Sequence, residues 1–170
     1  MHRRRDVLCW GVIRSPSPTV FERSVLIAAP VERVFGFHLD PDNLRHLNPP
    51  GVRTLRLEVD RPVRPGSKVT VSLRLFGLLR QDWVVAIAEV EDGRRLVDVA
   101  VSGPFASWRH EHRMEPVPGG TRLTDRIEFV AKGGPLLGSI GALLWRPQLA
   151  FLFWWRHRVT RGLIEAASER

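Results

Sequence analysis

The densest run of residues capable of proton transfer lies between Gly103 and Glu115, in the sequence GPFASWRHEHRME. If this run is a β-strand, its side chains alternate between two faces. Trp108, His110 and His112 then share one face, and the four charged side chains between and after them share the other. Four charges cannot face a dry interior, so we expect both histidines to point inward beside the tryptophan.

A tight turn at Pro118-Gly119 predicts which residues of the following strand face these side chains. The predicted pairs are Met114 with Leu123, His112 with Asp125, His110 with Ile127 and Trp108 with Phe129. Directly opposed residues lie about 5 Å apart at Cβ, within reach of a hydrogen bond. We therefore expect an inward pair of His112 and Asp125, in which the carboxylate fixes the imidazole tautomer and raises its basicity.

An inward histidine–aspartate pair has two interpretations. In a catalytic site, His112 activated by Asp125 removes a proton while His110 or Asp98 donates one. In a structural role, the pair is a hydrogen-bonded polar contact that fixes the strand register. No nucleophile is placed beside it, and two histidines with one aspartate are slender support for a metal site, so we expect neither a metal nor a cofactor.

The histidine strand belongs to a series of antiparallel strands. Period-two alternation and turn residues predict strands over Val20–Ala28, Leu55–Val59, Val69–Leu75, Gln81–Glu91, Arg94–Val101, Ser107–Glu115 and Thr121–Ala131. The hairpin at Asp92-Gly93 places Asp98 opposite Ile87. Both faces there are apolar, so the direction of Asp98 stays open; if it points inward, it adds a third polar wall to the site.

Three helices complete the pattern. Two short ones follow the first strand, because Pro30 and Pro41 each offer a proline at a first helical position. The segment Leu136–Ala167 lacks strand alternation and predicts one long helix, kinked at Pro147. Since the sheet must bury one face on this helix, we expect an α+β domain with a seven-stranded curved antiparallel sheet wrapped around the C-terminal helix and an apolar ligand cavity between them.

The basic composition does not favour a nucleic-acid partner. The net charge is +8, but the basic residues are arginines except for Lys68 and Lys132, and acids are interleaved with them throughout. Binding to phosphates requires clustered positive charge, so we expect no nucleic acid. The single Cys9 has no partner for a disulfide or a metal, which favours a reducing cytoplasm.

Two segments resemble membrane-directed sequences. Residues 1–18 carry three arginines and then the apolar run Val7–Ile13, but Arg14-Ser15-Pro16 stands where a signal peptide needs small residues. We therefore expect a flexible basic extension, with a membrane-surface anchor as the alternative. In Leu136–Trp155, glycines, polar residues and Arg146 argue against a membrane span. This segment carries more aromatic side chains than one buried stripe needs, so part of the cluster Phe151, Phe153, Trp154 and Trp155 is expected to face a partner or a lipid surface.

Three segments carry a resemblance to a known superfamily. They are AAPVERVF at residues 28–35, DPDNL at 40–44 and GPFASWRHEH at 103–112. With the order of the elements, they resemble the SRPBCC superfamily (START-like, Bet v 1-like, polyketide cyclase/dehydrase), and within it the bacterial ligand-binding SRPBCC domain proteins. The resemblance covers a single domain over residues 19–167. It implies a helix-grip fold with a hydrophobic pocket, and assigns no catalytic residue.

Three functions are compatible with these features. The first is non-catalytic binding of a hydrophobic or aromatic small molecule, lipid- or polyketide-like, by eight side chains: Trp83, Asp98, Trp108, His110, His112, Asp125, Phe129 and Phe151. The second is a cyclase or dehydratase that uses His112 and Asp125 as an acid–base pair. The third is an interaction protein that contacts a membrane or partner through Trp154-Trp155 or the basic extension. The sequence does not indicate an oligomeric state.

Overall fold

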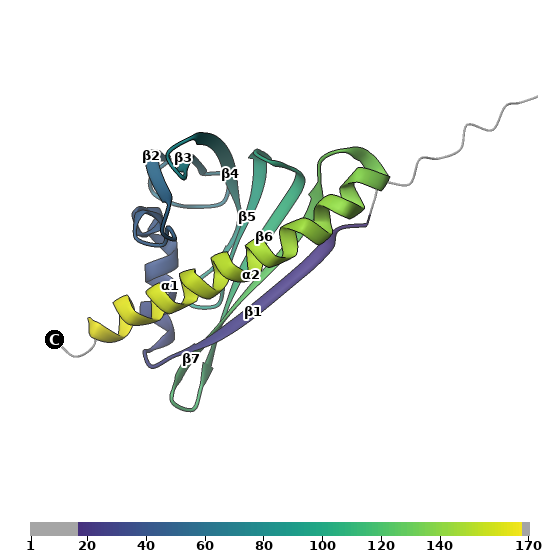
Figure 1. Ribbon diagram of the computed structural model, residues 1–170. Helices are drawn as coiled ribbons and strands as arrows, with labels where there is room; N and C mark the ends of the chain where they lie inside the picture. Colours follow the sequence, from purple (N-terminus) through teal and green to yellow (C-terminus); the bar gives the residue numbers. More distant parts are fainter. Residues whose placement is uncertain (1–16, 168–170) are drawn as a thin grey trace, which may run out of the picture.

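Seven antiparallel strands form one sheet in which the first strand of the chain lies beside the last. The computed structural model describes residues 17–167. The strands are β1 (Thr19–Ile27), β2 (Val52–Val59), β3 (Lys68–Leu75), β4 (Leu79–Glu91), β5 (Arg95–Ser102), β6 (Phe105–Val117) and β7 (Gly120–Ala131). Their order across the sheet is β1-β7-β6-β5-β4-β3-β2 (Figure 1). The predicted seven-stranded antiparallel sheet is confirmed; residues 1–16 of the expected extension lie outside the described residues.

Two short helical segments follow β1, as expected. Helix α1 (Val31–Leu39) begins directly after Pro30, and η1 (Pro41–Arg45) is a 3-10 helix. The side chain of Asp40 caps η1 by accepting a hydrogen bond from the Asp42 backbone N–H at 3.2 Å. Helix α1 packs on β5, β6 and β7, which closes one end of the sheet's inner face.

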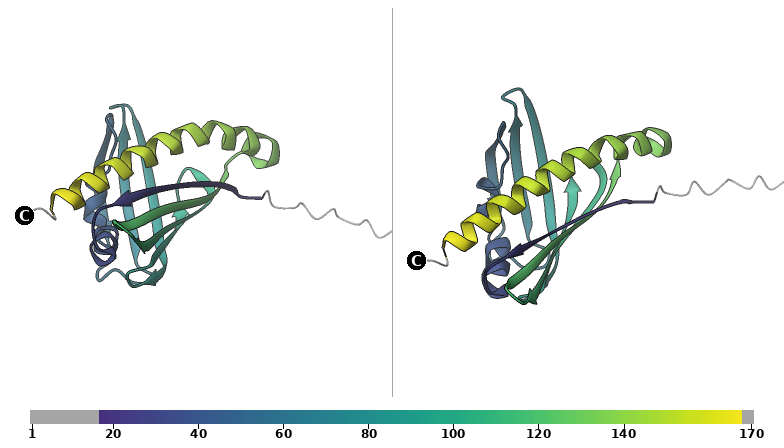
Figure 2. Two further views of the ribbon diagram at one scale, coloured as in Figure 1. Left: turned by 90° about the horizontal axis from the view of Figure 1, so that it is seen from below. Right: turned by 60° about the horizontal axis from the view of Figure 1, so that its bottom comes forward.

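The long C-terminal helix α2 (Gly134–Ala166) crosses the same face (Figure 1). It packs mainly on β1 and β7, and its inward residues Leu149 and Phe153 are buried against Phe129. The helix continues without a break through Pro147, where we expected a kink, and Figure 2 shows it as one bowed rod.

The aromatic cluster of α2 divides between the core and the surface. Phe153 is fully buried, whereas Phe151 is 52% and Trp154 43% exposed. Part of this cluster is therefore exposed, as predicted. The reason is that only one face of the helix packs on the sheet, so aromatic side chains on its other faces remain in contact with water. Within residues 17–167, no helix is both long enough and apolar enough to span a membrane.

The register of the sheet places a polar layer between two apolar clusters. The β6–β7 pairs predicted from the turn are all present, including His112 opposite Asp125. On β6, Met114 lies nearer the turn to β7 and belongs to one apolar cluster. Trp108 lies nearer the start of the strand and belongs to a second apolar cluster. The inward residues between Met114 and Trp108 are His112 and His110, so polar side chains occupy the middle of the inner face.

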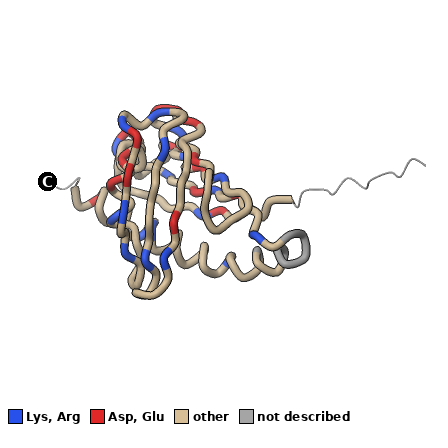
Figure 3. Tube along the Cα trace, turned by 90° about the horizontal axis from the view of Figure 1, so that it is seen from above, with Lys and Arg blue, Asp and Glu red and all other residues tan. Residues whose placement is uncertain are grey.

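The outer face of the sheet carries the charges. Positively and negatively charged residues are interspersed along the strands, as Figure 3 shows. Neighbouring residues on one strand form ion pairs, for example Arg109 with Glu111 and Arg126 with Glu128, each at 3.0 Å. This mixed surface fits the scatter of arginines and acids seen in the sequence, and it leaves the inner face for the site.

Candidate functional site

The carboxylate of Asp125 on β7 is the centre of a buried polar cluster. Its Oδ1 lies 3.0 Å from Nε2 of His110, and its Oδ2 lies 2.5 Å from Nε2 of His157. Nδ1 of His112 is 2.5 Å from Oδ1, although the two groups are not aligned as a hydrogen bond. Asp125 is only 2% exposed, so imidazoles take the place of water around it. The predicted inward pair of His112 and Asp125 is present, but Asp125 bonds more regularly to two other histidines.

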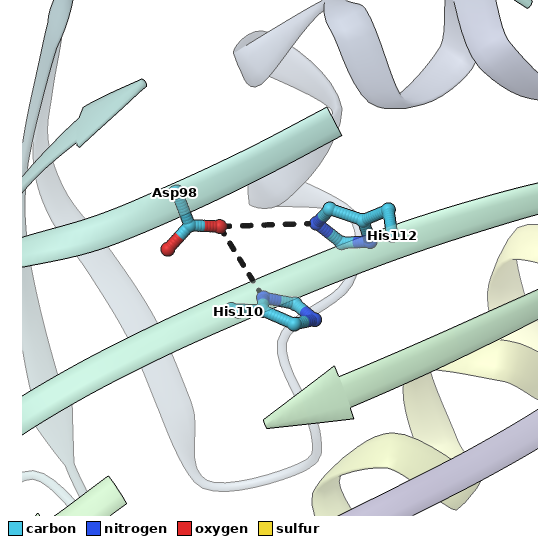
Figure 4. A group of neighbouring side chains, drawn as sticks. All are labelled: Asp98, His110 and His112. Atoms are coloured by element: carbon cyan, nitrogen blue, oxygen red, sulfur yellow. Dashed lines mark ion pairs between the residues drawn. The ribbon is translucent and has the colours of Figure 1, made fainter. Parts of the chain in front are cut away.

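A second carboxylate, that of Asp98 on β5, faces the same two β6 histidines (Figure 4). Its Oδ2 lies 3.3 Å from Nδ1 of His110 and 3.9 Å from Nε2 of His112. Asp98 is paired with Ile87 as predicted, and the register shift in β4 follows immediately after Ile87. The sequence left the direction of Asp98 open, and the structure turns it inward, where it forms the third polar wall.

Two further histidines reach the cluster from helices and were missed in the sequence. His38 of α1 lies with its ring 4.9 Å from that of His112, and its Nδ1 is 2.8 Å from the Val34 carbonyl oxygen. His157 of α2 is 4% exposed. Helical spacing could have identified both, because His38 follows Val34 by one turn and His157 follows Phe153 by one turn, each on the buried side of its helix.

Burial and the two carboxylates set different protonation states within the cluster. Burial alone lowers the pKa of His110, but Asp98 and Asp125 outweigh it and raise that pKa to about 9. Burial, and then the positive charge of His110, lowers the pKa of His112; burial and then His112 lower the pKa of His38 to about 3. Burial opposes ionisation of Asp125, yet the neighbouring histidines hold its pKa well below the usual range. At neutral pH, a charged His110–Asp125 pair therefore lies beside neutral His112 and His38.

Aromatic residues predicted to line a ligand site gather next to the polar cluster, with one exception. Trp83 packs edge-on against Trp108 with ring centroids 5.3 Å apart, and Trp108 and Phe129 are buried under α2. Phe151, which we expected beside them, instead lies on the outer side of α2 and contacts Trp154. A helix presents only one side to the sheet, and that side is taken by Phe153.

An apolar surface continues from the cluster across β3, β4 and β5. We call it the apolar floor and define it as the inward side chains of Val71, Leu73, Trp83, Val85 and Ala100. All five are partly exposed. Their exposure arises because α2 packs mainly on β1 and β7, at the other edge of the same face, and covers β3, β4 and β5 less. The floor places apolar surface within the concave side of the sheet, next to His110 and Asp98.

A separate surface pocket opens between β1 and α2. Its volume is about 230 Å³, and Arg23, Trp154, Arg158 and Arg161 contribute to its wall. His157 also lines it, so one histidine connects this pocket to the Asp125 cluster. Its arginine-rich wall contrasts in chemical character with the apolar floor.

Comparisons with known proteins relate the chain to one family. The profile of the family described as "Polyketide cyclase / dehydrase and lipid transport" matches residues 18–150. A comparison of the sequence with curated proteins gives no match.

Solved structures share the fold at low sequence identity. The di-domain ARO/CYC StfQ from the steffimycin biosynthetic pathway has a TM-score of 0.75 at 14% identity; the match covers 91% of this chain and 53% of that one. TTHA0849 from Thermus thermophilus has a TM-score of 0.70 at 20% identity, covering 88% and 99%. Ara h 8.0201 has a TM-score of 0.64 at 15% identity, with the same two coverages. These matches confirm the predicted helix-grip fold.

Proposed function

Because this chain belongs to the polyketide cyclase / dehydrase and lipid transport family, we propose that it binds a hydrophobic or aromatic small molecule, lipid- or polyketide-like, against the apolar floor. The family match bears out the resemblance drawn from the sequence. The predicted cavity between sheet and helix is part of this proposal.

The partial exposure of the apolar floor is the observation that carries the proposal. Side chains such as Val71 and Val85 point toward the interior of the domain, yet water still reaches them. Contiguous apolar surface of this kind marks ligand-binding sites, because an apolar ligand gains free energy by displacing water from it. Asp98 and His112, with side chains 15% and 16% exposed, supply polar groups at one edge that would orient the ligand.

Binding of a neutral aromatic probe tests the proposal. N-phenyl-1-naphthylamine fluoresces strongly when it leaves water, so a titration should show saturable enhancement with the wild-type protein. Val71→Lys places a charge on the floor and should weaken binding at least tenfold. Thr70→Lys places the same charge on the opposite face of β3 and should leave it unchanged.

Two results would contradict the proposal: no saturable enhancement with the wild type, or equal affinities for the two lysine variants. A control for folding is available in the circular-dichroism melting curve of each variant. Both substituted residues are partly exposed, so each lysine can extend its ammonium group toward water.

Acid–base chemistry on the bound molecule is the second candidate. It is favoured by the position of His112. This histidine is neutral at neutral pH, and its side chain lies at the partly exposed edge of the polar cluster. In this role, Nε2 of His112 removes a proton from carbon alpha to a carbonyl, and protonated His110 donates a proton to the carbonyl oxygen. The test is deuterium exchange into acetylacetone: His112→Ala should abolish any acceleration, and unchanged exchange in that variant would exclude this role.

A further inference from the structure

The two β6 histidines are held between two carboxylates with opposite ring nitrogens. His110 directs Nε2 to Asp125 and Nδ1 to Asp98, at 3.0 and 3.3 Å. His112 directs Nδ1 to Asp125 and Nε2 to Asp98, at 2.5 and 3.9 Å. Each ring therefore has one nitrogen on the Asp125 side and one on the Asp98 side, and Figure 4 shows the two nitrogens that face Asp98.

The Asp125 side favours one hydrogen on each ring. Asp125 is deeply buried, and its oxygens accept hydrogen bonds from Nε2 of His110 and of His157. Nδ1 of His112 lies 2.5 Å from the same carboxylate, in a contact that is not aligned as a hydrogen bond but that favours N–H over a lone pair on this nitrogen. A neutral histidine with its hydrogen on that side presents a lone pair on the other nitrogen. His110 is charged at neutral pH, so a metal ion would have to displace the proton on its Nδ1. Nδ1 of His110, Nε2 of His112 and Oδ2 of Asp98 then converge as three electron-pair donors, all within 4.8 Å of one another.

A single proton does not satisfy this arrangement. A hydrogen on Nδ1 of His110 would bridge the 3.3 Å contact to Asp98. It would leave Nε2 of His112 at 3.9 Å from the same carboxylate oxygen, beyond hydrogen-bond distance. A cation between the three donor atoms would satisfy all of them at once.

We propose that Asp98, His110 and His112 form a binding site for one divalent transition-metal ion of the zinc class, with Asp125 as the outer carboxylate that orients both imidazoles. This inference goes beyond the proposed ligand binding, and it revises the expectation, drawn from the sequence, that the chain holds no metal. Two imidazole nitrogens and one carboxylate oxygen are a donor set that zinc, iron and cobalt accept.

The two donor separations from Asp98 suit such an ion, and the third, between the histidine nitrogens, is no more than 4.8 Å. Donor atoms about 2.0–2.2 Å from a tetrahedral metal lie roughly 3.3–3.6 Å from one another. The observed separations from Asp98 Oδ2, 3.3 and 3.9 Å, are close to this range. Carboxylate contacts to the second nitrogen of a ligating histidine are the usual outer shell of metal sites, and here Asp125 supplies them for both rings. Three protein ligands leave a fourth coordination position on the metal open. Because Asp98 and His112 are partly exposed, we expect this position to lie on the side of the cluster that water reaches.

Cobalt binding to the full-length protein tests the site without a substrate. Protein stripped with EDTA and dialysed should bind one Co²⁺ per chain and develop the intense visible absorption of a four- or five-coordinate ion, which Zn²⁺ then displaces. Asp98→Asn should weaken binding at least tenfold, and so should His112→Asn. His46→Ala removes an exposed histidine outside the cluster and should change neither the stoichiometry nor the spectrum.

The result that would overturn the inference is a wild-type protein without the visible band, or one whose band is unchanged in both Asp98→Asn and His112→Asn. The test uses the wild-type protein and variants of two different metal-ligating residues, so it remains decisive if one variant fails to fold. The naphthylamine titration on the EDTA-treated protein separates the proposals: dye binding without cobalt binding refutes only the metal site, and cobalt binding without dye binding refutes only the ligand proposal.

Discussion

Replacement of Asp125 by asparagine should destabilise the fold more than any exchange of a surface charge. The aspartate accepts hydrogen bonds from His110 and His157 inside the protein and is 2% exposed. An asparagine at this position would keep the shape and one carbonyl oxygen, but its amide group would point N–H donors at a histidine N–H. The charge that balances protonated His110 would also be lost.

The size of the effect follows from these contacts. Hydrogen bonds to a charged group contribute about 1.5–3 kcal/mol each, and breaking a buried charge pair from one side costs about 3–5 kcal/mol. Because the two contributions overlap and asparagine retains one acceptor, we expect the free energy of unfolding to fall by about 3–5 kcal/mol. For a chain of this size, the melting temperature should fall by roughly 6–20 °C.

Urea denaturation followed by tryptophan fluorescence measures this change. The matched control is Glu128→Gln on the same strand, whose side chain is 30% exposed on the outer face and pairs with Arg126 at 3.0 Å. That variant should lose less than about 1 kcal/mol. If Asp125→Asn also loses less than about 1 kcal/mol, Asp125 does not hold the histidines together and the reasoning is refuted.

Three further substitutions test the packing around the site. Phe153→Ala should lower the free energy of unfolding by about 3–5 kcal/mol, because it empties a fully buried position, whereas Phe151→Ala on the outer side of α2 should lower it by less than about 1 kcal/mol; similar losses in urea titrations would contradict the assigned helix face. Gly120→Ala should cost at least about 2 kcal/mol, since φ is +142° and the new Cβ would lie 2.1 Å from the backbone oxygen of Ile27; a melting temperature equal to wild type would refute this. Thr121→Val should cost about 1–3 kcal/mol in chemical denaturation, because it leaves a buried backbone carbonyl after β1 without its 2.8 Å hydrogen bond, and an unchanged denaturation midpoint would show that water replaces the hydroxyl.

The sequence predicted the strand that carries the site because its local signals agree. Alternation assigned His110 and His112 to the inner face, and the Pro118-Gly119 turn placed His112 opposite Asp125. A short turn transmits its register along both strands. The β6–β7 half of the cluster could therefore be derived without any long-range information.

The rest of the cluster depends on interactions that a single strand does not encode. The pairing of β4 with β5 shifts by one residue between Ile87 and Glu89, and a bulge of this kind leaves no reliable mark in the sequence. His38 and His157 belong to helices whose rotation about their axes is set by packing on the sheet. The error at Phe151 has the same origin, since a helix rich in aromatic residues on all sides does not reveal which of them faces the core.

The location of a bound neutral probe is the most direct test of the central claim, that the apolar floor is the binding surface. Backbone-amide chemical shifts of isotope-labelled protein, followed during titration with N-phenyl-1-naphthylamine, report that location. The largest changes should fall on β3, β4 and β5 around Val71, Val85 and Ala100. Changes confined to the β1–α2 pocket around Arg23 and Arg158, or no saturable change, would contradict the claim.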